Sequence, residues 1–392
     1  MTPFSLDAFA RRCEHLQGDN PLRALTEVIN RVPNGINLGQ GVCDLGTPAP
    51  LVAGAAESIT GEEDRQTYTH YSGLPELKDE LRRKLREFNG LDLDPSEVMV
   101  TSGSSGAFTA AAMALFEPGD EVVLFEPFYS YHRSSLALLG CRPVSVPLVG
   151  RDFALDLRAL RAALGPRTRA IVVNTPGNPS GKVFTTAELE AIAELLDGTR
   201  VLVVTDEVYE YMCFDGRRHV SPAAIPALAP RTVTLGSFSK TFSITGWRVG
   251  YLAGPARIVE MAGRVFDQLV ICAPRPMQRG VARALRDLPP SFYEELGRGY
   301  ERKRDRFCAA LAAAGFRFAS PAGAYYVLAD YREVLGDLTP YDAALTLIER
   351  IGVNGVPGDV FYADPTGIRS LRFQFAVEPR VLDDVCERLA RL

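Results

Sequence analysis

The sequence predicts an α/β protein: a large domain with a mostly parallel, doubly wound sheet, and a smaller α+β domain. Three observations lead to this class. Short β-branched runs recur between about residues 98 and 254, amphipathic stretches separate them, and the pattern changes after about residue 285. Nearly continuous apolar strands are typical of a sheet covered by helices on both faces. With 392 residues and an apolar share of 46%, the chain can bury the cores of about two or three domains.

Each expected strand of the large domain ends in a polar or glycine-rich turn. The runs are VMVT, EVVLF, RPVSV, AIVVN, VLVVT and TVTLG. A helical pattern between two of them covers residues 186–196. In a doubly wound sheet, ligands bind at the carboxyl ends of the strands, so the residues that follow these runs are the candidates for chemistry.

The smaller domain is expected from the two ends of the chain. A long charged helix pattern covers 292–314, the strands AYYVLAD and LRFQFAV follow, and a last helix begins at Pro379. The first 45 residues, with the turn-rich stretch NLGQGVCDLGTPAP, are expected to pack with this part. The predicted division is therefore a large domain at 46–285 and a small domain formed by 1–45 and 286–392.

Composition narrows the class of partner. The net charge is only −5 and basic residues are scattered, so neither nucleic acid nor an anionic membrane is an expected partner. No signal-like start and no run of roughly 18 apolar residues occur, which favours a cytoplasmic location. The seven cysteines and four histidines show no disulfide or metal-ligand spacing, and no metal is expected. Small molecules and a second copy of the chain are the expected partners.

Reactive side chains follow several of the predicted strands. Lys240 lies a few residues beyond TVTLG, and Arg248 comes eight residues later. Asp206 and Tyr209 follow VLVVT, and Asn178 lies in a Pro- and Gly-framed turn after AIVVN. A lone lysine in a polar loop is ordinarily a solvated charge. Together with an acid, a phenol and an amide at neighbouring strand ends, it matches the needs of pyridoxal phosphate.

Each of these groups has a predicted role toward that cofactor. Lys240 holds the aldehyde carbon as a Schiff base, and Asp206 keeps the pyridine nitrogen protonated, so that the ring withdraws electrons from a substrate carbanion. Asn178 and Tyr209 reach the phenolic oxygen. Tyr129, which follows EVVLF, can stack on the ring.

The cofactor phosphate needs fixed donors. Ser104 and Ser105 stand where a helix begins, so that backbone N–H groups and the helix dipole face an anion there. Ser237 and the guanidinium of Arg248 complete the predicted cradle. Singly these signals are weak, since a serine turn is more often a plain connection, but their joint order is informative.

Nearly the whole chain resembles the fold-type I, class I/II aminotransferases, and within them the kynurenine, glutamine and methionine aminotransferase group. The segments that carry the resemblance are INLGQG, YTHYSGLPELKDEL, PGDEVVLFEPFY, NTPGNPSGKVF, TDEVYEYMCFDG, SFSKTFSITGWRVGY, PAGAYYVLAD, VPGDVFY and LRFQFAV. The resemblance implies the same roles for Lys240, Asp206, Tyr209, Asn178 and Tyr129.

The resemblance also implies three further roles. Arg372 resembles the arginine that binds the substrate α-carboxylate, with Asn178 and the backbone of Gly41 as further substrate contacts. Tyr68 resembles a tyrosine that reaches the phosphate of a neighbouring subunit. A homodimer with shared active sites is therefore implied.

Departures from the family pattern concern the substrate. Val42, Cys43, Ile271 and Cys272 stand where related enzymes often carry aromatic residues, and PRPMQ replaces the usual PTPLQ, which introduces Arg275. Asp359 adds a charge in PGD, near the expected substrate entrance or in a solvated loop. The loss of these aromatic residues argues against a strict aromatic preference. Arg372 is committed to the α-carboxylate, so an acidic side chain would need Arg275 or Arg133, and an inward-facing Asp359 would oppose it. We therefore expect a neutral, medium-sized donor such as methionine, glutamine or an aromatic amino acid.

Several functions compete with ping-pong transamination between an L-amino acid and a 2-oxo acid. A lyase or decarboxylase on the same fold and cofactor is the main alternative. Residues 237–240 formally spell the SxxK of serine acyl enzymes, but the partner motifs SDN and KTG are missing. GSSGAF does not match the dinucleotide fingerprint of an oxidoreductase. A non-enzymatic regulator would leave the complete set of cofactor contacts without a role.

Overall fold

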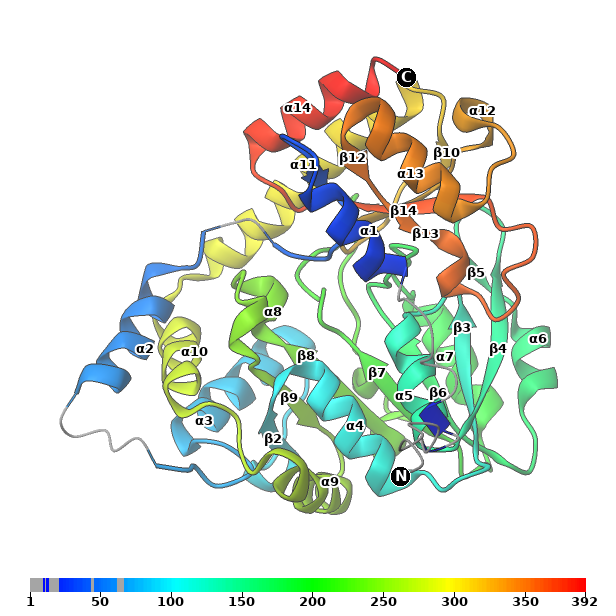
Figure 1. Ribbon diagram of the computed structural model, residues 1–392. Coiled ribbons are helices and arrows are strands. Elements are labelled where there is room, and N and C mark those ends of the chain that lie inside the picture. The colour runs from blue at the N-terminus through cyan, green and yellow to red at the C-terminus, as the bar shows by residue number, and fades with distance from the viewer. Residues whose placement is uncertain (1–9, 11, 14–20, 44–45, 62–66) are drawn as a thin grey trace, which may run out of the picture.

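The computed structural model describes residues 10, 12–13, 21–43, 46–61 and 67–392. In Figure 1 the strands and helices of the middle of the chain form the larger, lower part of the molecule. The last hundred residues gather with the first described helix in the smaller, upper part. The predicted domain boundaries at 45/46 and 285/286 stay a prediction.

Eight strands form the large sheet. They are β2 (Val98–Thr101), β3 (Glu121–Glu126), β4 (Arg142–Val149), β5 (Ala154–Leu155), β6 (Thr168–Asn174), β7 (Leu202–Asp206), β8 (Thr232–Ser237) and β9 (Gly250–Ala253). Their order across the sheet is β2-β9-β8-β7-β6-β3-β4-β5. The five strands from β8 to β4 are parallel, whereas β9 and β5 run antiparallel to their neighbours. The predicted α/β class and all six predicted strands are confirmed, and β5 and β9 are additions.

Helices cover both faces of this sheet. They are α2 (Ala49–Thr60), α3 (Pro75–Lys84), the π-helix η2 (Leu85–Asn89), α4 (Gly103–Leu115), α5 (Ser130–Leu138), α6 (Leu157–Ala163), α7 (Thr186–Leu196), α8 (Phe238–Thr241), α9 (Ala256–Val270) and α10 (Arg275–Asp287). Short 3₁₀ turns are η3 (Pro95–Glu97), η4 (Pro222–Ala224), η5 (Ala229–Arg231) and η6 (Thr245–Trp247).

Alternate residues of one strand enter different cores, as the pleat requires. On β3, Val122 and Leu124 pack in the core under α4 and α9. Val123 and Phe125 pack in the core on the other face, under α6 and α7. The near-continuous apolar run in the sequence therefore reflects a strand buried on both sides.

Helix α7 shows how local sequence sets a boundary. Thr185 precedes the helix, and its hydroxyl accepts a hydrogen bond from the Glu188 backbone N–H at 3.2 Å. The Glu188 carboxylate in turn accepts from the Thr185 backbone N–H at 2.9 Å. This reciprocal capping box fixes the start of the helix, and the predicted range 186–196 is confirmed.

The smaller part is built from both ends of the chain. Its elements are α1 (Pro21–Asn30), β1 (Ile36–Asn37), α11 (Pro290–Ala313), β10 (Arg317–Phe318), β11 (Tyr326–Asp330), α12 (Arg332–Leu335), α13 (Pro340–Ile351), β12 (Val353–Asn354), β13 (Val356–Pro357), the 3₁₀ turn η7 (Gly358–Phe361), β14 (Ser370–Gln374) and α14 (Pro379–Leu389). Strands β10-β11-β14-β13 form an antiparallel sheet. Strand β1 pairs with β12, and Figure 1 shows α1 beside α13, so residues 21–37 lie with this part. Residues 1–9, 11, 14–20 and 44–45 lie outside the described residues, and the packing expected for the whole of 1–45 stays a prediction.

Among the described residues, none of the helices combines the length and the apolar character needed to cross a bilayer.

Candidate active site

Lys240 lies where the two parts of the chain meet. It belongs to the short helix α8, which follows directly on β8. Its Nζ donates a hydrogen bond to the carbonyl oxygen of Gly41 at 2.8 Å and lies 5.6 Å from the centre of the Tyr325 ring. The Cys43 thiol donates to the carbonyl oxygen of Lys240, 3.7 Å away. The amine thus connects α8 to the segment around Gly41.

Arg372 and Asn178 come together across 194 residues of sequence. The Arg372 Nη1 donates to Asn178 Oδ1 at 2.9 Å, and Nη2 donates to the Gly39 carbonyl oxygen at 2.5 Å. The guanidinium lies 4.4 Å from the centre of the Tyr326 ring and 5.1 Å from that of Phe361. Its buried Nε has no hydrogen bond partner in the described part of the chain. A buried guanidinium with an unused N–H donor is suited to bind a carboxylate.

Asp206 is buried at the carboxyl end of β7, and its partner was not predicted. The Nε2 of His132, on α5, lies 3.1 Å from Asp206 Oδ2. The His132 ring also stacks on Phe108, with centroids 4.6 Å apart. A ring held from two sides fixes the orientation of the carboxylate beside it. The signal for His132 was its position three residues after Tyr129, in the same segment after a strand.

Tyr209 and Tyr326 form a buried pair of phenols. Their hydroxyl oxygens are 3.0 Å apart and their rings meet edge-on at 87°. Burial, with Tyr326 next to it, raises the pKa of Tyr209 well above its usual value, so this hydroxyl is a neutral donor. Burial likewise raises the pKa of Tyr129, whose ring edge meets His132. Tyr326 is a site residue that the sequence prediction missed, although it lies in PAGAYYVLAD, one of the segments that carry the family resemblance.

The expected phosphate cradle lies at the start of α4. Gly103 has a φ of +68°, and a Cβ added there would come within 2.5 Å of Arg248 Nη2. The Arg248 backbone is itself left-handed, with a φ of +56°, and its Nη1 donates to the Thr245 carbonyl oxygen at 3.1 Å. Ser104 and Ser105 occupy the first turn of α4. The guanidinium therefore lies against the amino end of a 13-residue helix, an arrangement suited to an anion.

Ser237 stands at the other side of this region, as the amino-terminal cap of α8. Its hydroxyl accepts a hydrogen bond from the Ser239 backbone N–H at 3.1 Å and donates to Ser239 Oγ at 2.9 Å. The Val249 carbonyl oxygen also lies within 3.3 Å of this hydroxyl, so a bound phosphate would have to replace both acceptors for Ser237 to donate to it.

The residues present fit pyridoxal phosphate. The close approach of Gly103 to Arg248 leaves no room for a side chain where a phosphate would be held. Asp206 offers a fixed acid, Tyr209 and Asn178 offer a hydroxyl and an amide, and Lys240 offers an amine. These are the groups that the pyridine nitrogen, the phenolic oxygen and the aldehyde of this cofactor require.

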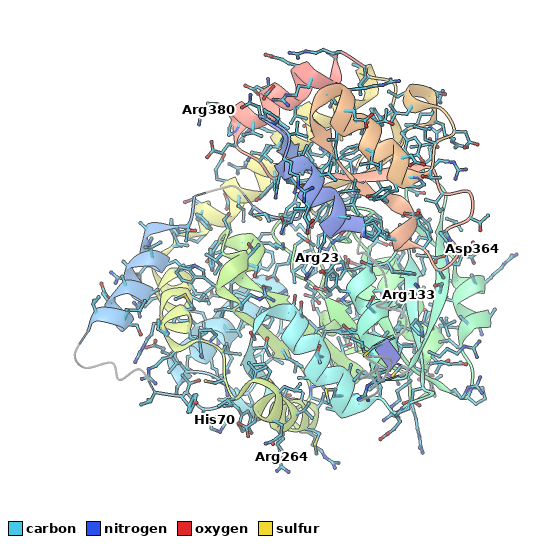
Figure 2. The ribbon with its side chains drawn as sticks, in the orientation of Figure 1. Arg23, His70, Arg133, Arg264, Asp364 and Arg380 are labelled. Atoms are coloured by element: carbon cyan, nitrogen blue, oxygen red, sulfur yellow. The ribbon has the colours of Figure 1, made fainter. Side chains whose placement is uncertain are left out.

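Three other predicted residues lie outside this cluster. Tyr68 is 76% exposed, and no hydrogen bond is found for it among the described residues. Its neighbourhood packs against α9, because a Cβ at Gly263 would come within 2.4 Å of Tyr71. Val42 and Ile271 are also exposed, at 40% and 45%. Figure 2 shows His70, two residues after Tyr68 in the sequence, and Arg264 of α9 on the lower edge of the molecule.

Asp359 is not the solvated loop acid considered above. It is half-buried at the start of η7, and its Oδ1 has no hydrogen bond partner in the described part of the chain. Desolvation raises the pKa of this carboxyl. Arg275 begins α10 and is half-buried.

A second polar cluster lies behind the end of β7. Glu207, Glu210 and His219 are close enough to share a cation. The ammonium of Lys84 already lies 2.5 Å from Glu210 Oε1, and Asn89 bridges to both carboxylates. We interpret the cluster as a buried ion-pair network and not as a metal site, because a lysine supplies the positive charge.

Residues 33–389 match the family model of aminotransferase class I and II. The chain belongs to this family. A probable N-succinyldiaminopimelate aminotransferase of Mycobacterium tuberculosis is 37% identical over 91% of this aminotransferase and 92% of its own length. Human kynurenine–oxoglutarate transaminase 1 is 33% identical over 91% of this chain and 92% of its own.

Solved structures agree with the aminotransferase fold. That of N-succinyldiaminopimelate aminotransferase from M. tuberculosis superposes with a TM-score of 0.91 at 36% identity, covering 98% of this chain and 99% of the other. That of YbdL from Escherichia coli, described as having a methionine aminotransferase function, gives 0.92 at 31% identity, with the same coverage. The fold-type I class and the aminotransferase activity are confirmed, with pyridoxal phosphate as the cofactor of the family and amino and oxo acids as substrates.

Proposed function

We propose that this aminotransferase takes the amino group of a neutral or aromatic L-amino acid and passes it to a 2-oxo acid by a ping-pong mechanism. The observation that carries the proposal is the setting of Arg372. Its guanidinium lies against the rings of Tyr326 and Phe361, and its Nε has no hydrogen bond partner among the described residues. A substrate α-carboxylate that binds this guanidinium brings its side chain among aromatic groups.

The roles proposed for the chain's own residues follow from their contacts. Arg372 and Asn178 bind and orient the α-carboxylate. Lys240 is the general base, which removes the α-proton with Nζ and later returns it. The Gly41 carbonyl, 2.8 Å from Nζ, aims this amine between proton transfers. When bound, pyridoxal phosphate supplies the electron sink that makes the α-proton acidic.

Asp206 and His132 act on the far side of the cofactor ring. Asp206 keeps the pyridine nitrogen protonated, and His132 holds the carboxylate through the 3.1 Å contact. Tyr209 donates to the phenolic oxygen, and Arg248 with Ser104, Ser105 and Ser237 holds the phosphate.

The preference for a neutral side chain has an energetic reason. A second carboxylate, buried without a cation, costs several kcal/mol. Arg372 is engaged by the first carboxylate, and the rings beside it offer no charge. Arg275, at the start of α10, is the residue that could pair with an acidic substrate side chain, and this has to be tested.

N-succinyldiaminopimelate is the second candidate donor, because a relative named for it is 37% identical to this chain. This molecule carries further carboxylates, so it makes the opposite prediction about charge. A lyase or decarboxylase is not favoured, since the named relatives are aminotransferases.

A donor panel separates the two candidates. It compares kcat/KM for methionine, glutamine, phenylalanine and kynurenine with that for aspartate, glutamate and N-succinyldiaminopimelate, in the native enzyme and in Arg275→Ala. We expect a neutral donor to lead. A native preference for an acidic donor of about tenfold or more, roughly 1.4 kcal/mol, that disappears in Arg275→Ala would overturn the neutral-donor proposal.

We also propose a homodimer with shared active sites, located in the cytoplasm, where seven free thiols remain reduced. The exposed ring of Tyr68 supports the dimer, because most of its surface is left uncovered by its own subunit and is available to a second one. The test mixes inactive Lys240→Ala and Tyr68→Phe subunits. Hybrid dimers should regain activity at one of their two sites, and mixtures no more active than the separate variants would exclude a Tyr68 that crosses the interface.

A further inference from the structure

The hydroxyl oxygens of Tyr209 and Tyr326 lie 3.0 Å apart, so one of the two hydroxyls donates a hydrogen bond and the other accepts it. Each phenol owns a single hydrogen. If the Tyr209 hydroxyl donated its hydrogen bond to Tyr326, it could not donate one to an oxygen of the cofactor. The direction of this one hydrogen bond therefore decides whether Tyr209 can do what is proposed for it.

Either hydroxyl could donate in the structure itself, but a bound cofactor gives Tyr209 a second partner and Tyr326 none, which selects one direction. Within the described residues, the Tyr209 hydroxyl is the one hydrogen bond partner found for the Tyr326 hydroxyl. Tyr326 must then donate to Tyr209 if its own buried hydrogen is to be satisfied. The hydrogen of Tyr209 is left free to point away from Tyr326.

The Tyr326 hydroxyl has no room to turn elsewhere. A Cβ at Gly41 would lie 2.1 Å from it, so the Gly41 backbone packs directly against the hydroxyl. The Arg372 guanidinium lies 4.4 Å from the centre of the Tyr326 ring, and the centre of the Tyr325 ring lies 4.6 Å from it. The strand pairing of Tyr326 with Gln374 fixes the backbone.

We propose that Tyr326 is a positioning residue, whose hydroxyl donates to Tyr209 and thereby directs the hydrogen of Tyr209 to the phenolic oxygen of pyridoxal phosphate. This inference rests on the proposed role of Tyr209. A hydroxyl that accepts a hydrogen bond is a better donor, because hydrogen bonds in a chain polarise one another. Tyr326 also links this donor to Arg372, the proposed carboxylate site.

The inference is tested through the pKa of the imine between Lys240 and the cofactor. A donor to the phenolic oxygen makes that oxygen less basic and so makes the neighbouring imine proton easier to lose. Weakening the donor therefore raises the imine pKa. The charged or titratable groups that face the pair are Tyr129, Tyr300, Tyr325 and Arg372, and none of them is altered.

The experiment is an absorbance titration of the loaded enzyme without substrate. Tyr326→Phe keeps the ring under Arg372 and removes only the hydroxyl. We expect the imine pKa to rise by about 0.3–1 unit, which is a two- to tenfold decrease of its acid dissociation constant. This is the size expected for the loss of one net hydrogen bond. Tyr331→Phe is the matched control. It removes another buried hydroxyl just beyond β11, one that donates to the Leu338 carbonyl oxygen, and should leave the imine pKa at the native value.

Two further variants separate this inference from the role on which it rests. Tyr209→Phe should raise the imine pKa by more than Tyr326→Phe does. The double variant should match Tyr209→Phe alone, because Tyr326 acts only through Tyr209. A native or lowered imine pKa in Tyr326→Phe, or shifts that add in the double variant, would overturn the inference and leave Tyr209 in place. An unshifted Tyr209→Phe would remove the role of Tyr209 itself.

Discussion

Gly103→Ala tests the phosphate cradle through a residue that has no polar side chain. The added Cβ would lie 2.5 Å from Arg248 Nη2 and 2.9 Å from Cζ, where ordinary contacts begin near 3.4 Å. The guanidinium is the end of a flexible side chain, so it can retreat, by about 1 Å. Charge-assisted hydrogen bonds from arginine to phosphate have lengths of about 2.7–2.9 Å and do not survive such a shift.

The expected loss follows from these contacts. Hydrogen bonds to charged groups contribute about 1.5–3 kcal/mol, so cofactor affinity should fall about 10- to 150-fold. The left-handed φ of +68° adds a separate cost of about 1–2 kcal/mol to folding stability. The affinity is best measured by absorbance titration with pyridoxal phosphate in a Lys240→Ala background, where covalent attachment cannot mask the phosphate contacts.

Gly90→Ala is the matched control. Gly90 caps η2 with a φ of +72°, and a Cβ there meets nothing within 4 Å. It should show the same loss of folding stability with native cofactor affinity. If Gly103→Ala loses stability to the same extent as Gly90→Ala but binds the cofactor with native affinity, Arg248 does not hold the phosphate and the cradle is wrongly placed.

Three further outcomes are expected. Lys240→Ala should keep the cofactor bound but not covalently, so that borohydride labels only the native enzyme, and near-native turnover would exclude Lys240 as the base. Asp206→Asn should slow α-proton removal in a single turnover by more than tenfold while carboxylate binding changes little, and unchanged rates would exclude its role at the pyridine nitrogen. Lys84→Met leaves the carboxylate of Glu210 buried without its cation and should lower the free energy of unfolding in urea by about 3–5 kcal/mol, whereas a loss below about 1 kcal/mol would mean that the network is solvated.

The strands and the residues at their ends could be predicted because they depend on local patterns. Apolar runs stop where the chain reaches the edge of the sheet, and polar groups such as Asp206 and Asn178 stand at that point. The strand β9 was missed, because its four residues include a glycine and follow directly on the turn that carries Arg248.

The partners of the predicted residues depend on packing that no local pattern encodes. His132 reaches Asp206 only because the face of α5 that carries His132 in its first turn packs toward the sheet. The sequence PAGAYYVLAD offers two adjacent tyrosines, and both are buried, so alternation does not say which hydroxyl meets Tyr209. The register of β11 against β14 decides it.

The contact between Arg372 and the Gly39 carbonyl, 333 residues apart, has a consequence for the order in which the site is made. Every residue proposed to hold the cofactor within its own subunit lies between Ser104 and Arg248. On a ribosome that stretch emerges well before β14, and the large sheet that positions it is complete once β9 has been translated. The carboxylate side must wait until β14 has been translated and has found the segment that was synthesised at the very beginning. A nascent chain could therefore retain the cofactor well before it can hold an amino acid.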